Sequence, residues 1–442
     1  MQKLKISQIV SISLMLFAIF FGAGNMIFPP QLGQNAGTNM FTALAGFIFT
    51  DAGIAVLGIV AVVLVGTTIN DLGNIVGKKF SLCFAALLYL LLGPLFALPR
   101  TGTVSFELAV LPFLGEGMNP TVFSIIFTAI FFIVTYFLSS NPSKIVDIVG
   151  KVLTPILLIA IVVIWVGTVL NPGAIGAPVG DYATMPFFEG MIEGYLSVDG
   201  IAGPIFAIMV IQAIRNTGVT EKKSVVKYTL LCGLVAALLL SVVYYLLVYI
   251  GATSSSLGSF SNGGQLLSAV TQQLYGSSGS LILGIAVLFA CLTTSIGLTS
   301  AFSEYFSEVL PKYSYKQIAA AICIFSFGVA NIGLSTLITV TLPVLMMVFP
   351  VTVVLIVLSF FKNYIKDKKM VYILGMLFAF IVAFIDAFDD VNIYLGPLTD
   401  LAKMIPLFEL GIGWVIPAII GSLIGFLPFL NRKSSKQEVL NA

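Results

Sequence analysis

The chain has 442 residues, of which 59% are hydrophobic and 9% are charged, whereas a soluble domain carries roughly 25% charged residues. This composition and the mean hydropathy of +1.09 exclude a soluble globular protein. The 21 basic and 19 acidic side chains are dispersed and leave a formal net charge of only +2, which excludes a nucleic-acid partner.

Apolar stretches of membrane-spanning length recur along the whole sequence. A helix needs roughly 17 to 25 predominantly apolar residues to cross the hydrocarbon core, and these stretches lack the alternating pattern of a membrane barrel. We therefore predict an all-α integral membrane protein with about twelve transmembrane helices. The predicted helices cover residues 8–28, 41–66, 80–105, 120–138, 145–170, 190–213, 225–251, 279–303, 316–333, 335–360, 370–388 and 409–430.

The basic residues fall almost entirely on one side of this topology. If twelve spans start in the cytoplasm, 19 of the 21 Lys and Arg residues lie in cytoplasmic segments, and only Arg100 and Lys403 do not. Cytoplasmic loops of membrane proteins carry this kind of excess. We therefore predict that both termini are cytoplasmic.

The first predicted helix contains Gly22-Ala-Gly-Asn25-Met-Ile-Phe-Pro-Pro30 near the middle of the membrane. Glycine costs about 1 kcal/mol in a helix interior, so this cluster needs a reason. Two interpretations are open for this segment alone. The small residues either pack closely against a neighbouring helix, or the helix is unwound there.

The sixth predicted helix is interrupted as well. It contains Tyr195-Leu-Ser-Val-Asp-Gly-Ile-Ala-Gly-Pro-Ile-Phe206, in which Asp199, two glycines and a proline break an apolar segment. An intramembrane acid costs about 2.5 to 3.5 kcal/mol on insertion scales and usually marks a functional cavity. Because the breaks fall in the first and sixth spans, they occupy corresponding positions of two five-helix halves, which indicates a transporter with an inverted repeat.

Two such breaks would offer binding groups of opposite polarity. The N-terminus of a half-helix presents free N–H groups, which suit a carboxylate, and exposed carbonyl groups suit a cation or an ammonium group. A zwitterion fits both. Because nearby side chains such as Ile205 and Phe206 are apolar, we predict an amino acid with an aliphatic side chain as the substrate.

The eighth predicted helix contains Cys291-Leu-Thr-Thr-Ser-Ile-Gly297, which places three adjacent hydroxyl groups in an apolar span. These hydroxyls either bond back to carbonyl groups of the preceding turn, or they join carbonyl oxygens around a sodium ion. Both interpretations are open from the sequence.

The remaining charged residues of the predicted spans are interpreted as structural. Asp51 and Glu107 lie at or near apolar parts of the second and third helices, and Arg100 can pair with a helix end or with a carboxylate. Four acids near the outer end of the eleventh helix are expected to form a solvated rim: Asp386, Asp389, Asp390 and Asp400.

The sequence offers little material for catalysis. It has no histidine, and its four cysteines lie in apolar runs without C-x-x-C spacing, which argues against imidazole relays and metal clusters. We predict that the protein is not an enzyme and needs no cofactor. A channel would require pore-lining repeats in a symmetric oligomer, and the unlike halves argue against it.

Three segments together carry a resemblance to a known family: Gly22 to Pro30, Gly93-Pro-Leu-Phe-Ala-Leu-Pro-Arg-Thr-Gly-Thr-Val-Ser-Phe-Glu107, and Cys291-Leu-Thr-Thr294. With them the chain resembles, nearly end to end, the bacterial branched-chain amino acid carriers. The resemblance implies a leucine-transporter-like fold with discontinuous first and sixth helices. The first five-helix repeat is then expected in residues 1–175, the second in residues 176–364, and two accessory helices with a cytoplasmic tail in residues 365–442.

The resemblance also implies a set of site residues. The N–H groups of Ala23 and Gly24 would hold the substrate carboxylate, and carbonyls of the helix 6 break would hold its ammonium group, with Asp199 as a possible direct partner. The implied substrate-binding residues are Ala23, Gly24, Asn25, Ser197, Val198, Asp199 and Gly200. The implied sodium ligands are Ala18, Phe21, Ala290, Thr293 and Thr294, and a shift to Cys291, Thr294 and Ser295 in helix 8 is equally permitted.

The function implied by the resemblance is the import of leucine, isoleucine and valine across the bacterial cytoplasmic membrane. We expect cation symport by alternating access, with sodium as the coupling ion. The alternative is a proton-coupled carrier of another small neutral amino acid or solute.

Overall fold

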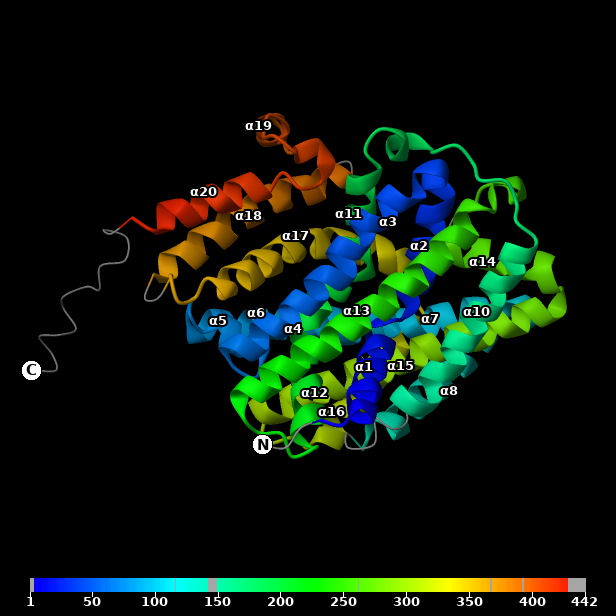
Figure 1. Ribbon diagram of the computed structural model, residues 1–442, viewed down its shortest axis with the longest axis horizontal. Coiled ribbons are helices and arrows are strands. Elements are labelled where there is room, and N and C mark those ends of the chain that lie inside the picture. The colour runs from blue at the N-terminus through cyan, green and yellow to red at the C-terminus, as the bar shows by residue number, and fades with distance from the viewer. Residues whose placement is uncertain are drawn as a thin grey trace, which may run out of the picture.

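The computed structural model describes residues 4–115, 117–141, 149–260, 262–365, 368–391 and 393–427. In these ranges the chain forms helices and no strands, as the apolar stretches predict (Figure 1). The helices are α1 (Ile6–Phe20), α2 (Ala23–Ala36), α3 (Met40–Ile48), α4 (Ile54–Val65), α5 (Ile69–Gly73), α6 (Lys78–Leu90), α7 (Ala97–Ala109), α8 (Pro120–Ser139), α10 (Thr154–Leu170), α11 (Pro186–Ser197), α12 (Asp199–Arg215), α13 (Lys222–Ala252), α14 (Gly263–Tyr275), α15 (Ser277–Val309), α16 (Tyr315–Ala330), α17 (Leu334–Phe360), α18 (Lys369–Asp390), α19 (Pro397–Lys403) and α20 (Val415–Gly425).

Many of these helices are long and apolar enough to cross a membrane. Eight helical runs of the described residues meet that condition, and the bent pair of α11 and α12 raises the number to nine. Three shorter apolar helices, α1, α16 and α20, come in addition. The prediction of a helical protein with many spans is confirmed, and the number of twelve stays a prediction.

Two of the predicted helices are each divided into two α-helices by a short break. The predicted helix 8–28 is α1 followed by α2, because Gly22 is extended, with φ −120° and ψ −154°. The predicted helix 190–213 is α11 followed by α12, which are bent by 45° at Val198. Val198 has a φ of 73°, and this left-handed conformation is rare for a β-branched residue.

Other element boundaries also differ from the sequence expectation. The predicted helix 80–105 contains a π-helical segment, Leu91–Leu95, between α6 and α7, because Gly93 leaves the helical region and Pro94 has no N–H. A second π-helical segment, Phe49–Gly53, connects α3 to α4. The sequence analysis missed α14, which is too short to span the membrane and begins after Asn262, whose side chain accepts a hydrogen bond from the N–H of Gln265.

Glycines allow α11 and α12 to approach α3 and α4 backbone to backbone. A Cβ atom at Gly190 would lie 1.9 Å from the carbonyl oxygen of Ala43, and one at Gly203 would lie 2.1 Å from that of Ala55. No larger residue fits at either position without moving a helix. Small residues serve the same purpose at many membrane helix interfaces.

The remaining helices surround this centre. The long helix α13 runs diagonally across the view and packs against α2, whereas α18 and α20 lie side by side at the edge opposite α8 and α10 (Figure 1). In the described residues α18 also packs against α17.

Candidate functional site

The two helix breaks face one small internal pocket. It has a volume of about 20 Å³, which corresponds to room for roughly one water molecule, so an amino acid fits only after the surrounding helices move. The residues that line it come from α1, α2, α11, α12, α15 and the segment from Leu91 to α7: Ile19, Phe20, Gly22, Ala23, Gly24, Asn25, Leu92, Ala97, Arg100, Thr101, Ser197, Val198, Asp199, Ala202, Phe206, Thr294 and Leu298.

The N-terminus of α2 supplies unused backbone donors to this pocket. The first hydrogen bond of this turn runs from the N–H of Met26 to the carbonyl of Gly22, at 3.3 Å. The earlier N–H groups, those of Ala23, Gly24 and Asn25, therefore have no acceptor within the helix. Gly22 caps the helix without a side chain, so the positive end of the α2 dipole is left open toward the pocket.

A buried arginine lies between the two breaks. Arg100 on α7 donates hydrogen bonds to the carbonyls of Leu196 and Ser197, at 3.4 and 3.3 Å, where α11 ends. Its guanidinium group also lies over the ring of Phe96, 4.6 Å from the centroid. Of the two partners that the sequence left open for Arg100, a helix end or a carboxylate, the structure gives the helix end. Its neighbour on α7, Glu107, does not line the pocket.

A chain of buried polar side chains connects the first break to the second. The Asn25 amide donates to Asp199 at 2.7 Å and to the Tyr244 hydroxyl at 2.5 Å. Tyr244 in turn donates to Asp51 at 2.5 Å, and Ser197 also donates to Asp51. Asp51 lies in the π-helical segment Phe49–Gly53 and is fully buried. The hydrogen-bond partners of Asp51 are therefore hydroxyl groups and not Arg100.

Hydroxyl groups of α15 meet the carbonyl end of α1. Thr293 donates to the carbonyls of Ala18 and Ala290, at 2.7 and 2.9 Å, and Thr294 donates to the carbonyl of Ile19 at 2.8 Å. Carbonyls in the last turn of a helix lack intrahelical donors, which explains why they accept these bonds. Four of the five predicted sodium ligands are thereby brought together.

The structure does not bring the other predicted ion ligands into these hydrogen bonds. The ring of Phe21 stacks against Phe17 and Tyr244, and the contacts described above do not involve its carbonyl. Ser295, which belongs to the shifted set in helix 8, lies 3.0 Å from the hydroxyl of Thr135 on α8. Thr293 therefore meets the carbonyl end of α1, whereas Ser295 of the shifted set faces α8.

Six of the seven predicted substrate-binding residues line the pocket, and Gly200 does not. A Cβ atom at Gly200 would lie 2.7 Å from the Phe349 ring and 2.9 Å from the carbonyl of Thr50. Gly200 therefore permits close packing on the side of α12 that faces α17 and the π-helical segment.

The sequence analysis missed three features of the site. These are the Tyr244 hydroxyl between Asn25 and Asp51, the Ile19 carbonyl that accepts from Thr294, and the position of Arg100 beside α2. Tyr244 and Ile19 lie inside apolar helices, where nothing in the local sequence separates them from their neighbours. The signal for Arg100 was the topology itself, because it is one of only two basic residues outside the cytoplasmic segments.

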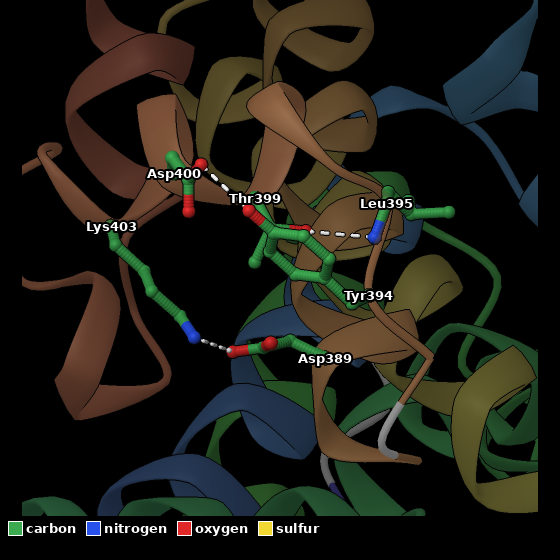
Figure 2. Close-up of polar contacts among 6 residues, drawn as sticks. All are labelled: Asp389, Tyr394, Leu395, Thr399, Asp400 and Lys403. Atoms are coloured by element: carbon green, nitrogen blue, oxygen red, sulfur yellow. Dashed lines mark hydrogen bonds and ion pairs between the residues drawn. The ribbon is translucent and has the colours of Figure 1, made fainter.

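The acids that the sequence analysis expected at an outer rim do not line this pocket. The Lys403 ammonium group lies 3.0 Å from Asp389, and Tyr394 donates a hydrogen bond of 2.6 Å to Asp400 (Figure 2). Lys403 is about half-exposed and Asp400 is exposed. The bond to Asp400 raises the pKa of the Tyr394 phenol, because the neutral phenol is the donor.

The chain was compared with known proteins. The family model of the branched-chain amino acid transport protein matches residues 5–432. The branched-chain amino acid permease BraB of Bacillus subtilis is 42% identical over 437 residues, which cover 98% of each chain. The permease BrnQ of the same organism is 43% identical over 430 residues, 96% of this chain and 98% of that protein. BrnQ of Escherichia coli K12 is 35% identical over 425 residues, 95% of this chain and 94% of that protein.

Solved structures share the fold at low identity. The nucleobase-cation-symport-1 family transporter MHP1, in a closed conformation with bromovinylhydantoin bound, matches with a TM-score of 0.64 and 14% identity over 97% of this chain and 95% of its own. MhsT in complex with L-phenylalanine matches with a TM-score of 0.57 and 16% identity over 94% of this chain and 97% of its own. The fold is thus that of leucine-transporter-like proteins, and from the family match the chain belongs to the branched-chain amino acid transport proteins, which are membrane permeases and not enzymes.

Proposed function

We propose that the protein imports leucine, isoleucine and valine by cation symport, with sodium as the coupling ion. The observation that carries this proposal is the meeting of the two helix breaks at one pocket, which brings the N-terminus of α2 opposite the carbonyl end of α11 and Asp199. Relatives that share 35–43% of the sequence are named branched-chain amino acid permeases, which supports the class of substrate.

The pocket supplies a group for each part of a branched-chain amino acid. The N–H groups of Ala23 and Gly24 would receive the carboxylate. The carbonyl of Ser197 would accept from the ammonium group, and Asp199, oriented by Asn25, would balance its charge. The apolar lining residues Leu92, Ala202, Phe206 and Leu298 suit an aliphatic side chain.

Sodium would bind where α15 meets the end of α1. The hydroxyl of Thr293 lies within hydrogen-bond distance of the carbonyls of Ala18 and Ala290, and that of Thr294 lies 3.4 Å from the Ala18 carbonyl. Sodium sites of this fold use unwound carbonyls and helix ends. In this proposal the Phe21 carbonyl turns to the ion when it binds. An ion there would take the place of the hydrogen bonds that the two hydroxyls now donate to the end of α1.

The proposed topology has twelve spans with both termini in the cytoplasm of a bacterial cell. Residues 1–175 and 176–364 form two inverted five-helix repeats, and residues 365–442 form two accessory helices and a tail. In support, breaks occur after α1 and after α11, at matching places of the two repeats. The pairing of α18 with α20 beside α17 suits accessory helices.

Transport would proceed by alternating access. Substrate and sodium bind from outside, the helices around the breaks rock, and both leave inward. Coupling requires that the ion favour substrate binding or the outward-facing state. Because the pocket is smaller than an amino acid, the conformation described here must open before it can bind or release one.

Uptake of radiolabelled leucine into proteoliposomes tests the proposal. An inward sodium gradient should drive accumulation, and unlabelled isoleucine and valine should compete, whereas alanine and glutamate should not. Accumulation driven by a pH gradient without any response to sodium would reject sodium coupling in favour of the alternative, a proton-coupled carrier. Competition by other small neutral solutes but not by isoleucine or valine would reject the substrate class.

A further inference from the structure

Arg100 is a buried cation that makes no ion pair among the described residues. Its side chain is 4% exposed, its Nε has no hydrogen-bond partner, and no Asp or Glu of the described residues forms an ion pair with it. The two carbonyl bonds of its Nη atoms are long, at 3.3 and 3.4 Å. Burying a charge is costly unless it is paired, and Asp199, the acid that acts on the guanidinium group electrostatically, makes no ion pair with it.

The guanidinium group faces the same part of the pocket as the N-terminus of α2. A Cβ atom at Gly24 would lie 2.8 Å from Nη2 of Arg100. Two positive features, a guanidinium group and a helix N-terminus with unused N–H groups, therefore meet at one place. An anionic ligand satisfies both, and the planar fork of an arginine matches a carboxylate in particular.

An acidic side chain also lines this pocket. Asp199 lines the pocket together with Arg100, and it is oriented by the amide of Asn25 at 2.7 Å. A pocket lined by an arginine and an aspartate that form no ion pair with each other offers a group for each end of a zwitterion.

We propose that Arg100 binds the α-carboxylate of the transported amino acid, together with the N–H groups of α2. The inference rests on the proposed function, because it assigns a residue to the substrate of that same pocket. When Arg100 turns toward the carboxylate, it releases the carbonyls of Leu196 and Ser197. These carbonyls then accept from the substrate ammonium group, so the substrate replaces the contacts that Arg100 makes in the closed pocket.

The test separates carboxylate recognition from a purely structural role of Arg100. Binding of L-leucine and of L-leucinamide, which keeps the ammonium group but has no carboxylate, is measured by calorimetry on the purified full-length protein in sodium buffer. The variants are Arg100→Gln and Arg100→Lys, of which the second keeps a buried cation. Arg215→Gln is the matched control, because Arg215 is an exposed arginine at the end of α12.

We expect Arg100→Gln to weaken leucine binding by about 10- to 100-fold, the usual range for a lost charge-assisted hydrogen bond. Leucinamide binding should change by less than about threefold, because the lost partner is absent from it. Arg100→Lys should fall between wild type and Arg100→Gln, and Arg215→Gln should match wild type.

Three results would overturn the assignment. If Arg100→Gln binds leucine as wild type does, Arg100 does not contact the carboxylate. If it weakens leucine and leucinamide equally, Arg100 only holds α7 to the end of α11. A wild-type protein that binds leucinamide as tightly as leucine would also reject carboxylate recognition, whereas one that binds neither would reject the proposed function itself.

Discussion

The two helix breaks interrupt their spans in different ways. Between α1 and α2 the chain is opened by Gly22 in an extended conformation, whereas between α11 and α12 a single valine holds a left-handed conformation. The carbonyl end of α1 is covered by threonine hydroxyls of α15, but that of α11 is covered by the guanidinium group of Arg100.

This difference relates each break to a different kind of ligand. Neutral hydroxyls and carbonyls at the first break suit a small cation. Such an ion loses its hydration water when it binds, but it does not have to displace a charged side chain. A charged side chain at the second break suits a ligand that can exchange with it. The first break is open in the backbone without strain, and the second has a strained backbone that its surroundings must hold in place.

The largest expected effect comes from closing the space that both breaks share. Gly24→Val would place side-chain atoms against Arg100 and within 3.2 Å of the Ser197 carbonyl, so leucine binding and uptake should be lost while the protein still reaches the membrane. Gly328→Val on α16 is the control, because nothing lies within 4 Å of a Cβ there. Uptake that survives in Gly24→Val would show that the substrate binds elsewhere.

A smaller effect is expected from the hydroxyls at the first break. The double variant Thr293→Val and Thr294→Val keeps the shape of both side chains but removes both oxygens, so sodium stimulation of leucine uptake should fall by about 10-fold or more. Sodium-independent binding of leucine should change less. Ser295→Ala serves as the control, because Ser295 faces Thr135. Loss of the sodium response in Ser295→Ala would move the ion site to the shifted set of ligands.

The strain at the second break predicts a smaller loss of stability there than at another buried valine. Val198→Gly removes a buried side chain, but glycine adopts the positive φ without steric cost, which offsets about 1 to 3 kcal/mol of the lost burial. Val210→Gly within α12 also removes a buried valine but relieves no strain, so it should lower the free energy of unfolding by more than Val198→Gly does. Thermal unfolding in detergent measures both. Equal destabilisation by the two variants would mean that the conformation at Val198 is not strained.

The smallest effect is expected outside the two breaks, at the rim of Figure 2. The bond to Asp400 raises the pKa of Tyr394, so the bond is present while the phenol is neutral and is lost as pH rises through that pKa. Asp400→Asn should lower the pKa toward the ordinary value of tyrosine, as followed by NMR of ring-labelled tyrosine. Asp389→Asn, which removes only the pair with Lys403, should leave the pKa of Tyr394 unchanged. Neither variant should change leucine uptake.

The sequence predicted the existence of the breaks better than their chemistry. Glycine, proline and asparagine within apolar runs identified both interruptions, because those residues disfavour helix locally. Tyr244 and Asp51 could not be assigned to each other, since 193 positions separate them and their contact depends on how α13 packs against the π-helical segment. The π-helical segment itself left no signal in Phe49–Gly53 beyond one acid and one glycine.

The place of Arg100 was likewise hidden. Its side chain reaches the end of α11 across 96 to 97 positions of sequence, and only the packing of α7 decides that it meets a helix end and not a carboxylate. Gly200 shows the opposite case. Its neighbours in the break line the pocket, but the turn of α12 directs it toward Phe349.

The glycine contacts of α11 and α12 have a mechanical consequence. Because Gly190 and Gly203 let these helices touch the backbone at Ala43 and Ala55, sliding along that seam would press the side chains beside the glycines against the facing carbonyls. The seam should therefore travel as a single rigid body during transport. The interfaces that can part are those made by side chains alone, where Arg100 and the two threonines meet the breaks. A disulfide engineered across the glycine seam should leave turnover intact, whereas one between α7 and α11 should arrest it.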